Sequence, residues 1–229
     1  MIRIYNHNDK VVVDYLENNP YVPYFISYPR TGSHWIRYVM EKYFKKPSLV
    51  VIYEYVNSKE FTSYHTHDFN GDDDTSVGDI KKENVIYLYR DPVDTIYSMI
   101  KYKNMVLSNE ETIKINVECY RNHLTKWLID DNFTKNKLII KYENFKNNFS
   151  LEFKKICDYY KVDFDSSKLN DIIEGLDKTK IKKESTNQYS KIDNTRTYDI
   201  DRSNFKENYT DLINDIMFNN NLQLKKFFN

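Results

Sequence analysis

Short apolar runs alternate with amphipathic segments along most of this chain. Residues 22–28 are mostly apolar or aromatic and lie between two prolines, which predicts a buried strand. Residues 33–44 carry apolar side chains three and four positions apart, which predicts a helix directly after that strand. Further strands or extended segments are predicted at 48–55, 60–67, 84–90 and 137–145.

Amphipathic segments fill the intervals between these strands. Asp91 and Pro92 follow the strand at 84–90 and are typical of a helix start, with Asp near the N-cap and Pro in the first turn. Apolar side chains at helical spacing recur further along the chain. They predict helices over 113–127, 153–160 and 208–219.

Two segments lack this periodicity. Residues 70–79 contain Gly and a run of Asp and predict a loop, and residues 177–203 are polar, basic and irregular. The alternation of strands and helices elsewhere predicts an α/β fold of three layers, with a central, mostly parallel sheet and helices on both of its faces. No repeat or linker interrupts this pattern, so we expect a single domain over residues 1–229.

Composition narrows the range of functions. The chain has 229 residues, of which 40% are hydrophobic and 30% charged, and its formal net charge is zero. A neutral balance argues against non-specific nucleic-acid binding, which needs a basic surface. Cys119 and Cys157 lack metal-ligand spacing, and we expect reduced thiols. There is no apolar leader and no apolar run of ~20 residues, so we expect a cytoplasmic protein without a membrane span.

Residues 28–35, YPRTGSHW, join the first predicted strand to the first helix. A helix that begins after such a turn offers backbone N–H groups and the positive end of its dipole to an anion. Gly32 permits close approach of the backbone, and Arg30 offers a planar fork for phosphate or sulfate oxygens. The junction therefore predicts an anion site, with an ordinary capped turn as the alternative. It lacks the G-x-x-x-x-G-K-[ST] pattern of ATP-binding P-loops.

A second junction, YLYRDPVDTIYSMI, places Arg90 at a strand end and Ser98 eight residues later, on the next helix. In a parallel sheet, Arg90 would emerge on the same edge as the 28–35 turn. Two anion sites on one edge favour a ligand with two separated phosphates. A salt bridge from Arg90 to Asp91 or Asp94 is the purely structural alternative.

The two junctions resemble those of sulfotransferases that use 3′-phosphoadenosine 5′-phosphosulfate (PAPS). The family's 5′-phosphosulfate loop commonly reads P-K-S-G-T-T-W, and residues 29–35 read P-R-T-G-S-H-W. Its 3′-phosphate motif is R-[DN]-P-x-D with a Ser eight residues after the Arg, and residues 90–98 match it. The resemblance implies a P-loop-NTPase-like sulfotransferase fold that binds PAPS. In these two motifs it assigns to the donor Arg30, Thr31, Gly32, Ser33, His34, Trp35, Arg90 and Ser98.

Weaker matches extend the resemblance over residues 22 to about 215. The family often has K-[TS]-H at a strand end between the two motifs, and residues 65–67 align with it, so His67 falls on the family's catalytic base. The segment KYENF resembles one in which a tyrosine contacts adenine, which implies that role for Tyr142. The segment SNFKENYT resembles G-D-W-K-N-x-F-T, which implies donor-binding roles for Phe205 and Lys206.

The chain also departs from the family pattern. Arg30 replaces the commoner Lys, His34 replaces Thr, and His65 replaces Lys. The family's Arg-x-Gly segment, which usually closes over the 3′-phosphate, is not evident. Arg196 and Arg202 are the nearby candidates for its role.

The resemblance implies in-line transfer of a sulfuryl group from PAPS to a hydroxyl or amine of a small-molecule or glycan acceptor. The product nucleotide is adenosine 3′,5′-bisphosphate (PAP), and no metal is required. Arg30 would stabilise charge on the leaving phosphate, and His67 would take the acceptor's proton, since an imidazole titrates near ~6.5. On an extended segment His65 shares the face of His67, so it is the alternative base.

Two other functions remain open from the sequence. The first is a P-loop-type nucleotide phosphotransferase, although the chain lacks Gly-Lys-[Ser/Thr] and an obvious Mg²⁺-binding pair. The second is a PAP-binding protein without catalytic activity, which the departures at Arg30 and His65 favour.

Overall fold

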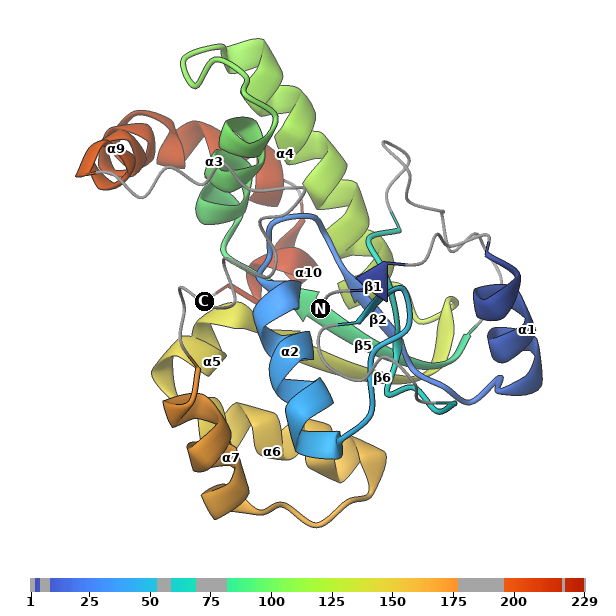
Figure 1. The fold of residues 1–229 in the computed structure, drawn as a ribbon. Coiled ribbons are helices and arrows are strands. Elements are labelled where there is room, and N and C mark those ends of the chain that lie inside the picture. Colours follow the sequence, from blue (N-terminus) through green and yellow to red (C-terminus); the bar gives the residue numbers. More distant parts are fainter. Residues whose placement is uncertain are drawn as a thin grey trace.

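The computed structural model describes residues 3–4, 9–52, 59–68, 82–176, 196–219 and 221–228; the loop predicted at 70–79 lies outside these ranges. Within them, the central sheet has four parallel strands in the order β4-β2-β5-β6. They are β2 (Tyr24–Ser27), β4 (Tyr64–Thr66), β5 (Lys82–Tyr89) and β6 (Thr134–Lys141). Figure 1 labels β2, β5 and β6 among them.

Side chains of β5 alternate between two hydrophobic clusters, one on each face of the sheet. Val85, Tyr87 and Tyr89 belong to one cluster, and Ile86 and Leu88 belong to the other. All five are buried. A parallel strand that is buried on both faces explains why its sequence is nearly continuous in apolar and aromatic residues.

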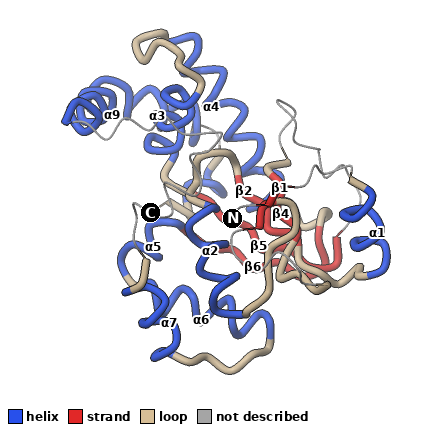
Figure 2. The backbone as a smooth tube through the Cα atoms, in the orientation of Figure 1, coloured by secondary structure: helices blue, strands red, loops and turns tan. Residues whose placement is uncertain are grey.

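Helices cover both faces, and Figure 2 shows the strands between two groups of helices. On the side of Tyr87 lie α3 (Pro92–Tyr102), α4 (Glu110–Leu124), the π-helical turn η1 (Thr125–Ile129), α9 (Arg196–Phe218) and α10 (Leu222–Lys225). On the side of Leu88 lie α2 (Ser33–Phe44), α5 (Tyr142–Asn147), α6 (Phe149–Tyr160) and α7 (Ser166–Glu174). The three-layer α/β arrangement with a parallel sheet is confirmed.

The N-terminal part extends the molecule beyond strand β4. Helix α1 (Lys10–Asn18) buries Val12 in a small cluster with Leu49, Val50 and Tyr64. Strand β1 (Arg3–Ile4) pairs antiparallel with β3 (Val51–Ile52), which is the strand part of the predicted segment 48–55 within the described residues.

Two expectations about element boundaries were wrong, and some helices were not predicted. The strand predicted at 137–145 ends at Lys141, because Tyr142, Phe145 and Phe149 recur at helical rather than alternating spacing and pack on the α2 side. Helix α9 begins at Arg196 and not near 208, so part of the segment predicted to be irregular is helical. Helices α1 and α7 were not predicted, since each is short and only one residue in each is buried.

Candidate active site

The carboxyl ends of β2 and β5 lie side by side and bring the two predicted anion sites together. Ser27, the last residue of β2, is paired in register with Leu88 of β5. The turn at 28–32 and Arg90 therefore leave the sheet at the same edge, as the sequence predicted. Tyr142 enters this edge from the end of β6, which pairs with β5. In α/β proteins, ligands bind outside this edge of the sheet.

The turn after β2 has an unusual backbone. Arg30 and Gly32 both have positive φ angles, 72° and 94°, and Thr31 Oγ1 donates a hydrogen bond of 2.8 Å to the carbonyl of Tyr28. Helix α2 begins at Ser33, directly after Gly32 (Figure 1). A non-Gly residue with positive φ carries strain that is common at ligand-binding turns. The turn thus directs the first N–H groups of a twelve-residue helix toward the edge of the sheet.

The ring of Tyr142 packs directly on Gly32. A Cβ atom at position 32 would lie 2.4 Å from Tyr142 Cε2, which is shorter than any real contact of this kind. Trp35 meets the same ring edge-on, with 6.1 Å between ring centroids, and the guanidinium of Arg90 lies 4.7 Å from its centroid. The predicted adenine-contacting residues Trp35 and Tyr142 are therefore neighbours.

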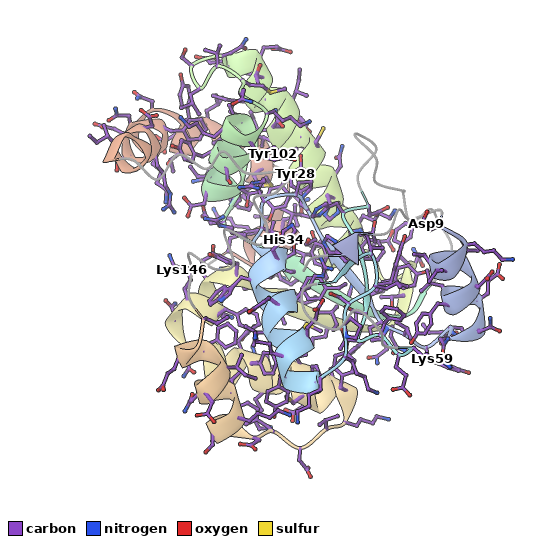
Figure 3. All side chains as sticks on the ribbon, viewed as in Figure 1. Asp9, Tyr28, His34, Lys59, Tyr102 and Lys146 are labelled. Atoms are coloured by element: carbon purple, nitrogen blue, oxygen red, sulfur yellow. The ribbon has the colours of Figure 1, made fainter. Side chains whose placement is uncertain are left out.

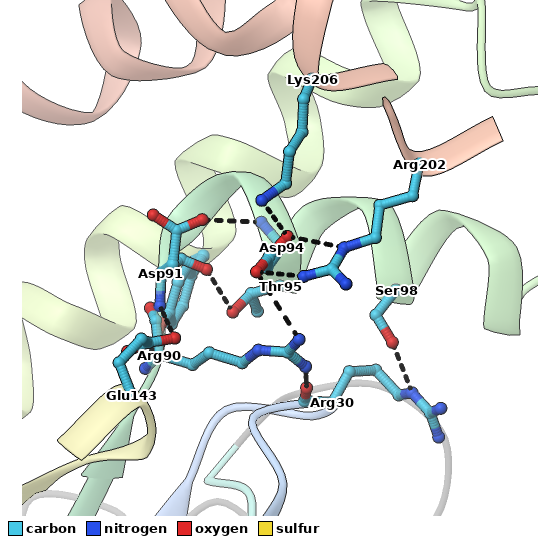
Figure 4. Close-up of polar contacts among 10 residues, drawn as sticks. Arg30, Arg90, Asp91, Asp94, Thr95, Ser98, Glu143, Arg202 and Lys206 are labelled. Carbon is cyan, nitrogen blue, oxygen red and sulfur yellow. Dashed lines mark hydrogen bonds and ion pairs between the residues drawn. The ribbon is translucent and has the colours of Figure 1, made fainter. Parts of the chain in front are cut away.

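Arg30 links the two predicted anion sites. Its Nε donates a hydrogen bond of 3.2 Å to Ser98 Oγ on α3 (Figure 4). Its guanidinium lies 4.9 Å from the centroid of the Tyr102 ring. Its backbone carbonyl accepts a hydrogen bond of 3.1 Å from Arg90 Nη1. Figure 3 labels Tyr102, Tyr28 and His34. His34 lies at the start of α2. Arg30, Arg90 and Ser98 thus form one connected group.

The backbone at Arg90 is held from two sides. Tyr120 Oη accepts from the Arg90 N–H at 3.1 Å and donates to the Arg90 carbonyl at 2.8 Å. Burial raises the pKa of the Tyr120 phenol, so it stays protonated and can serve both bonds. Glu143 Oε1 accepts from the next N–H, that of Asp91, at 3.2 Å. Burial raises the pKa of the Glu143 carboxyl.

Asp94 forms ion pairs with a cation of the 90–98 segment and with cations of helix α9. Its carboxylate accepts hydrogen bonds of 3.0 and 2.6 Å from Arg202, and it lies 2.8 Å from Lys206 Nζ and 3.8 Å from Arg90 Nη2 (Figure 4). Burial acts to raise the pKa of this carboxyl. The hydrogen bonds from Arg202 and Lys206 and the neighbouring positive charges outweigh burial and hold the pKa below its usual value.

The contacts of Asp94 concern two alternatives that the sequence left open. Arg202 reaches the 3′-phosphate motif, whereas the side chain of Arg196 lies outside the described residues. The salt bridge between Arg90 and Asp94, which was the structural alternative, is present at 3.8 Å. It coexists with the hydrogen bond from Arg90 to the carbonyl of Arg30 in the 28–35 turn.

Histidines line the β4 side of the turn. His67 Nδ1 lies 2.7 Å from the carbonyl of Ser27, so this nitrogen carries the hydrogen and the lone pair of a neutral His67 ring is on Nε2. The His65 ring meets the His67 ring edge-on at 4.6 Å and lies 6.4 Å from the His34 ring. His65 and His67 therefore share a face, as alternation predicts.

Not every predicted donor-binding residue faces this edge. Phe205 is buried and packs against Tyr97 of α3 and Tyr209 of α9, with ring centroids 5.4 and 5.1 Å away. The sequence analysis did not single out Tyr102, which lies four residues after Ser98, or Glu143, which directly follows Tyr142. The signal that could have found them is this closeness to a recognised motif residue.

The described residues contain no group of three or more His, Cys, Asp or Glu side chains arranged to hold a metal ion. Among the described helices, none combines the length and apolar character that crossing a bilayer requires.

Comparisons with known proteins agree with this geometry. The family profile of the sulfotransferase domain matches residues 24–229. Among solved structures, the chain is similar to mouse sulfotransferase SULT7A1 complexed with PAP, with a TM-score of 0.59 and 17% sequence identity over 99% of this chain and 98% of that chain. At this identity the likeness establishes the shared fold. Comparison with curated proteins gave no match. Because the domain profile spans nearly the whole chain, the protein belongs to the sulfotransferase family.

Proposed function

We propose that the protein transfers a sulfuryl group from PAPS to a hydroxyl or amine of a small-molecule or glycan acceptor. The observation that carries this proposal is the connection between the two anion sites. Arg30 bonds to Ser98 across the edge of the sheet, and Arg90 bonds back to the carbonyl of Arg30. A ligand with two anionic groups on one nucleoside fits such a pair of linked sites better than a ligand with one.

The residues at this edge have the donor set that PAPS needs. The 5′-phosphosulfate would meet Arg30 and the N-terminus of α2, where Thr31, Gly32, Ser33 and His34 follow one another. The 3′-phosphate would meet Arg90 and Ser98, with the α9 cations Arg202 and Lys206 close by at Asp94. Trp35 and Tyr142 would flank adenine. Phe205, in contrast, would act by fixing α9 against α3.

PAPS supplies the sulfuryl group and leaves as PAP. The chain's own contribution is to position the reactants and to stabilise charge. Arg30 would stabilise the negative charge that develops on the leaving phosphate. His67 would accept the proton of the acceptor at Nε2, because its Nδ1–H is directed to the Ser27 carbonyl. His65 lies against the His67 ring and is the alternative base.

We also propose that residues 1–229 act as one domain in the cytoplasm and that the reaction needs no metal. The single-domain proposal is supported by the two main hydrophobic clusters, since both pack on the same sheet. Fixed cations at the site, Arg30, Arg90, Arg202 and Lys206, would supply the positive charge that a phosphotransferase obtains from Mg²⁺.

The experiment that tests the proposal is a transfer screen with labelled PAPS against phenols, alcohols, amines and saccharides, each with and without chelator. We expect a labelled product with at least one acceptor class and no loss of activity in chelator. Strict dependence on ATP and Mg²⁺ would favour a phosphotransferase. Tight PAP binding without transfer to any class would favour the inactive PAP-binding alternative.

A further inference from the structure

His123 of α4 is a buried histidine that neither predicted motif contains. It is 6% exposed, and both of its ring nitrogens have partners on other elements. Nδ1 lies 2.9 Å from Tyr87 Oη of β5, and Nε2 lies 2.8 Å from the backbone carbonyl of His67. The ring also meets Tyr28, the first residue of the 28–32 turn, at 5.4 Å between centroids. His123 thus touches the segments that follow β2 and β4 and the middle of β5.

The partners of His123 define its protonation. A carbonyl can only accept a hydrogen bond, so Nε2 carries the hydrogen and donates to His67, while Nδ1 accepts from the Tyr87 hydroxyl. Burial lowers the pKa of His123 to about 4, which keeps the ring neutral near neutral pH. Loss of the Tyr87 hydroxyl would leave Nδ1 without its donor and would remove one of the two hydrogen bonds that hold the ring in place.

Asp68, the residue after His67, is bound by residues of η1, the turn that follows α4. Trp127 Nε1 donates to Asp68 Oδ2 at 2.9 Å, and Lys126 Nζ lies 2.9 Å from the same oxygen. Both residues lie in the π-helical turn η1, and such turns are frequent at functional sites. Asp68 has a positive φ of 46°, and its N–H bonds to Thr66 Oγ1. Two consecutive residues beyond the end of β4 are therefore anchored to one helix.

We propose that His123 is a positioning residue for sulfuryl transfer: its Nε2–H fixes the main chain of His67, so that His67 Nδ1–H meets the Ser27 carbonyl and His67 Nε2 is presented as the base. The catalytic part of this inference rests on the proposed function of His67. The structural part does not, because the bonds from His123 to His67 and from His67 to Ser27 are properties of the chain alone.

The test compares Tyr87→Phe and His123→Phe with a matched control, Tyr89→Phe. Tyr89 lies two residues along β5 on the same face as Tyr87 and donates a part-buried hydrogen bond of 3.1 Å to the Phe227 carbonyl, far along the chain from His67. His123→Gln is the conservative variant, since its amide N–H can donate to the His67 carbonyl. Tyr87→Phe keeps the test available if His123→Phe fails to fold.

Two readouts are needed. Long-range ¹H–¹⁵N spectra of the imidazole rings at a pH about two units above ~6.5 report the His67 tautomer. The turnover number and the Michaelis constant for PAPS come from the acceptor that the screen identifies. We expect a pure Nδ1–H tautomer in the wild type, in Tyr89→Phe and in His123→Gln. In Tyr87→Phe and His123→Phe we expect mixed tautomers and a turnover number lowered about 10- to 100-fold, with the PAPS Michaelis constant nearly unchanged.

The outcomes separate this inference from the proposed function. An unchanged His67 tautomer in both Tyr87→Phe and His123→Phe would overturn the inference, whatever their activity. Equal loss of turnover in Tyr87→Phe and Tyr89→Phe would also overturn it, because the effect would then be one of general stability. Normal turnover in His67→Ala would overturn the proposed role of His67, and the tautomer readout would still decide whether His123 positions that ring.

Discussion

The ring of Tyr142 occupies the space in which a side chain at position 32 would begin. Gly32 has a φ of 94°, and a Cβ there would lie 2.4 Å from Tyr142 Cε2. Two independent constraints, the left-handed backbone and the aromatic ring, therefore exclude other residues from this position.

Gly32→Ala should weaken PAP binding and destabilise the fold. The left-handed conformation alone costs a non-Gly residue about 1–3 kcal/mol, and displacement of the Tyr142 ring adds to it. Calorimetry with PAP and thermal unfolding measure the two effects. Gly175→Ala, at a C-cap with negative φ of −75°, is the control and should leave PAP affinity unchanged. A Gly32→Ala protein that binds PAP normally would contradict the role of this turn.

Arg90→Ala should weaken the binding of PAP more than the binding of AMP. Arg90 belongs to the proposed 3′-phosphate site, and a lost hydrogen bond to a charged group costs about 1.5–3 kcal/mol. We expect PAP affinity to fall roughly 10- to 100-fold and AMP affinity to fall by less, since AMP loses only the support that Arg90 gives to the Arg30 carbonyl and the Tyr142 ring. Calorimetric titration with both nucleotides checks this. Equal affinity of the wild type for PAP and AMP would remove the basis for assigning residues 90–98 to a second phosphate.

His67→Ala should lower turnover by about 10²- to 10⁴-fold, the usual range for loss of a general base. PAP affinity should barely change, because the base acts on the acceptor. His65→Ala is the matched control, since the two rings lie 4.6 Å apart. Steady-state kinetics and PAP titration of both variants provide the measurement. Normal turnover in His67→Ala together with a large loss in His65→Ala would identify His65 as the base.

Asp94 should make stability depend on acidic pH. Its pKa in the folded protein lies below that of an exposed aspartate, ~3.9, so its contribution is fully present above that value and is lost as pH falls through the folded pKa. Asp94→Asn should lower stability by roughly 1–3 kcal/mol at pH 7, through its lost bonds to Arg202 and Lys206. The difference from the wild type should shrink below pH ~4.

Thermal unfolding of the wild type and Asp94→Asn between neutral and acidic pH checks this expectation. Glu110→Gln is a suitable control, because Glu110 makes only an exposed pair with Lys114. It should follow the wild type closely across the range. A constant difference between Asp94→Asn and the wild type at all pH values would show that the Asp94 charge is not responsible.

The edge of the sheet that holds the site could be predicted from the sequence, and the contacts across it could not. Two buried runs followed by Arg30 and Arg90 are enough to place both arginines at one edge, because parallel strands end together. In contrast, the packing of Tyr142 on Gly32 joins residues 110 positions apart, and no local pattern encodes it. His123 is a single histidine in an amphipathic helix, so its spacing gives no sign of its two partners.

Helix α9 illustrates the same limit on a larger scale. Its second half carries the apolar pattern that predicted a helix near 208–219, and Ile213 and Met217 are buried there. Its first half is mostly polar and is held by ion pairs, Arg202 with Asp94 and Asp201 with Lys101, together with the buried ring of Phe205. Such ion pairs depend on the position of α3 in the fold. The helical spacing of apolar residues covers only the second half of α9, so it does not mark where the helix starts.

The tyrosines on the α4 side of the sheet also set an alkaline limit for the protein. Tyr28, Tyr87 and Tyr120 are fully buried, and burial raises the pKa of each phenol above its ordinary value. In the unfolded chain these phenols ionise near pH ~10, whereas in the folded protein they stay neutral. The folded state therefore becomes less stable relative to the unfolded state as pH rises past that point. The protein should therefore unfold in strong base, and these phenols should ionise together with unfolding.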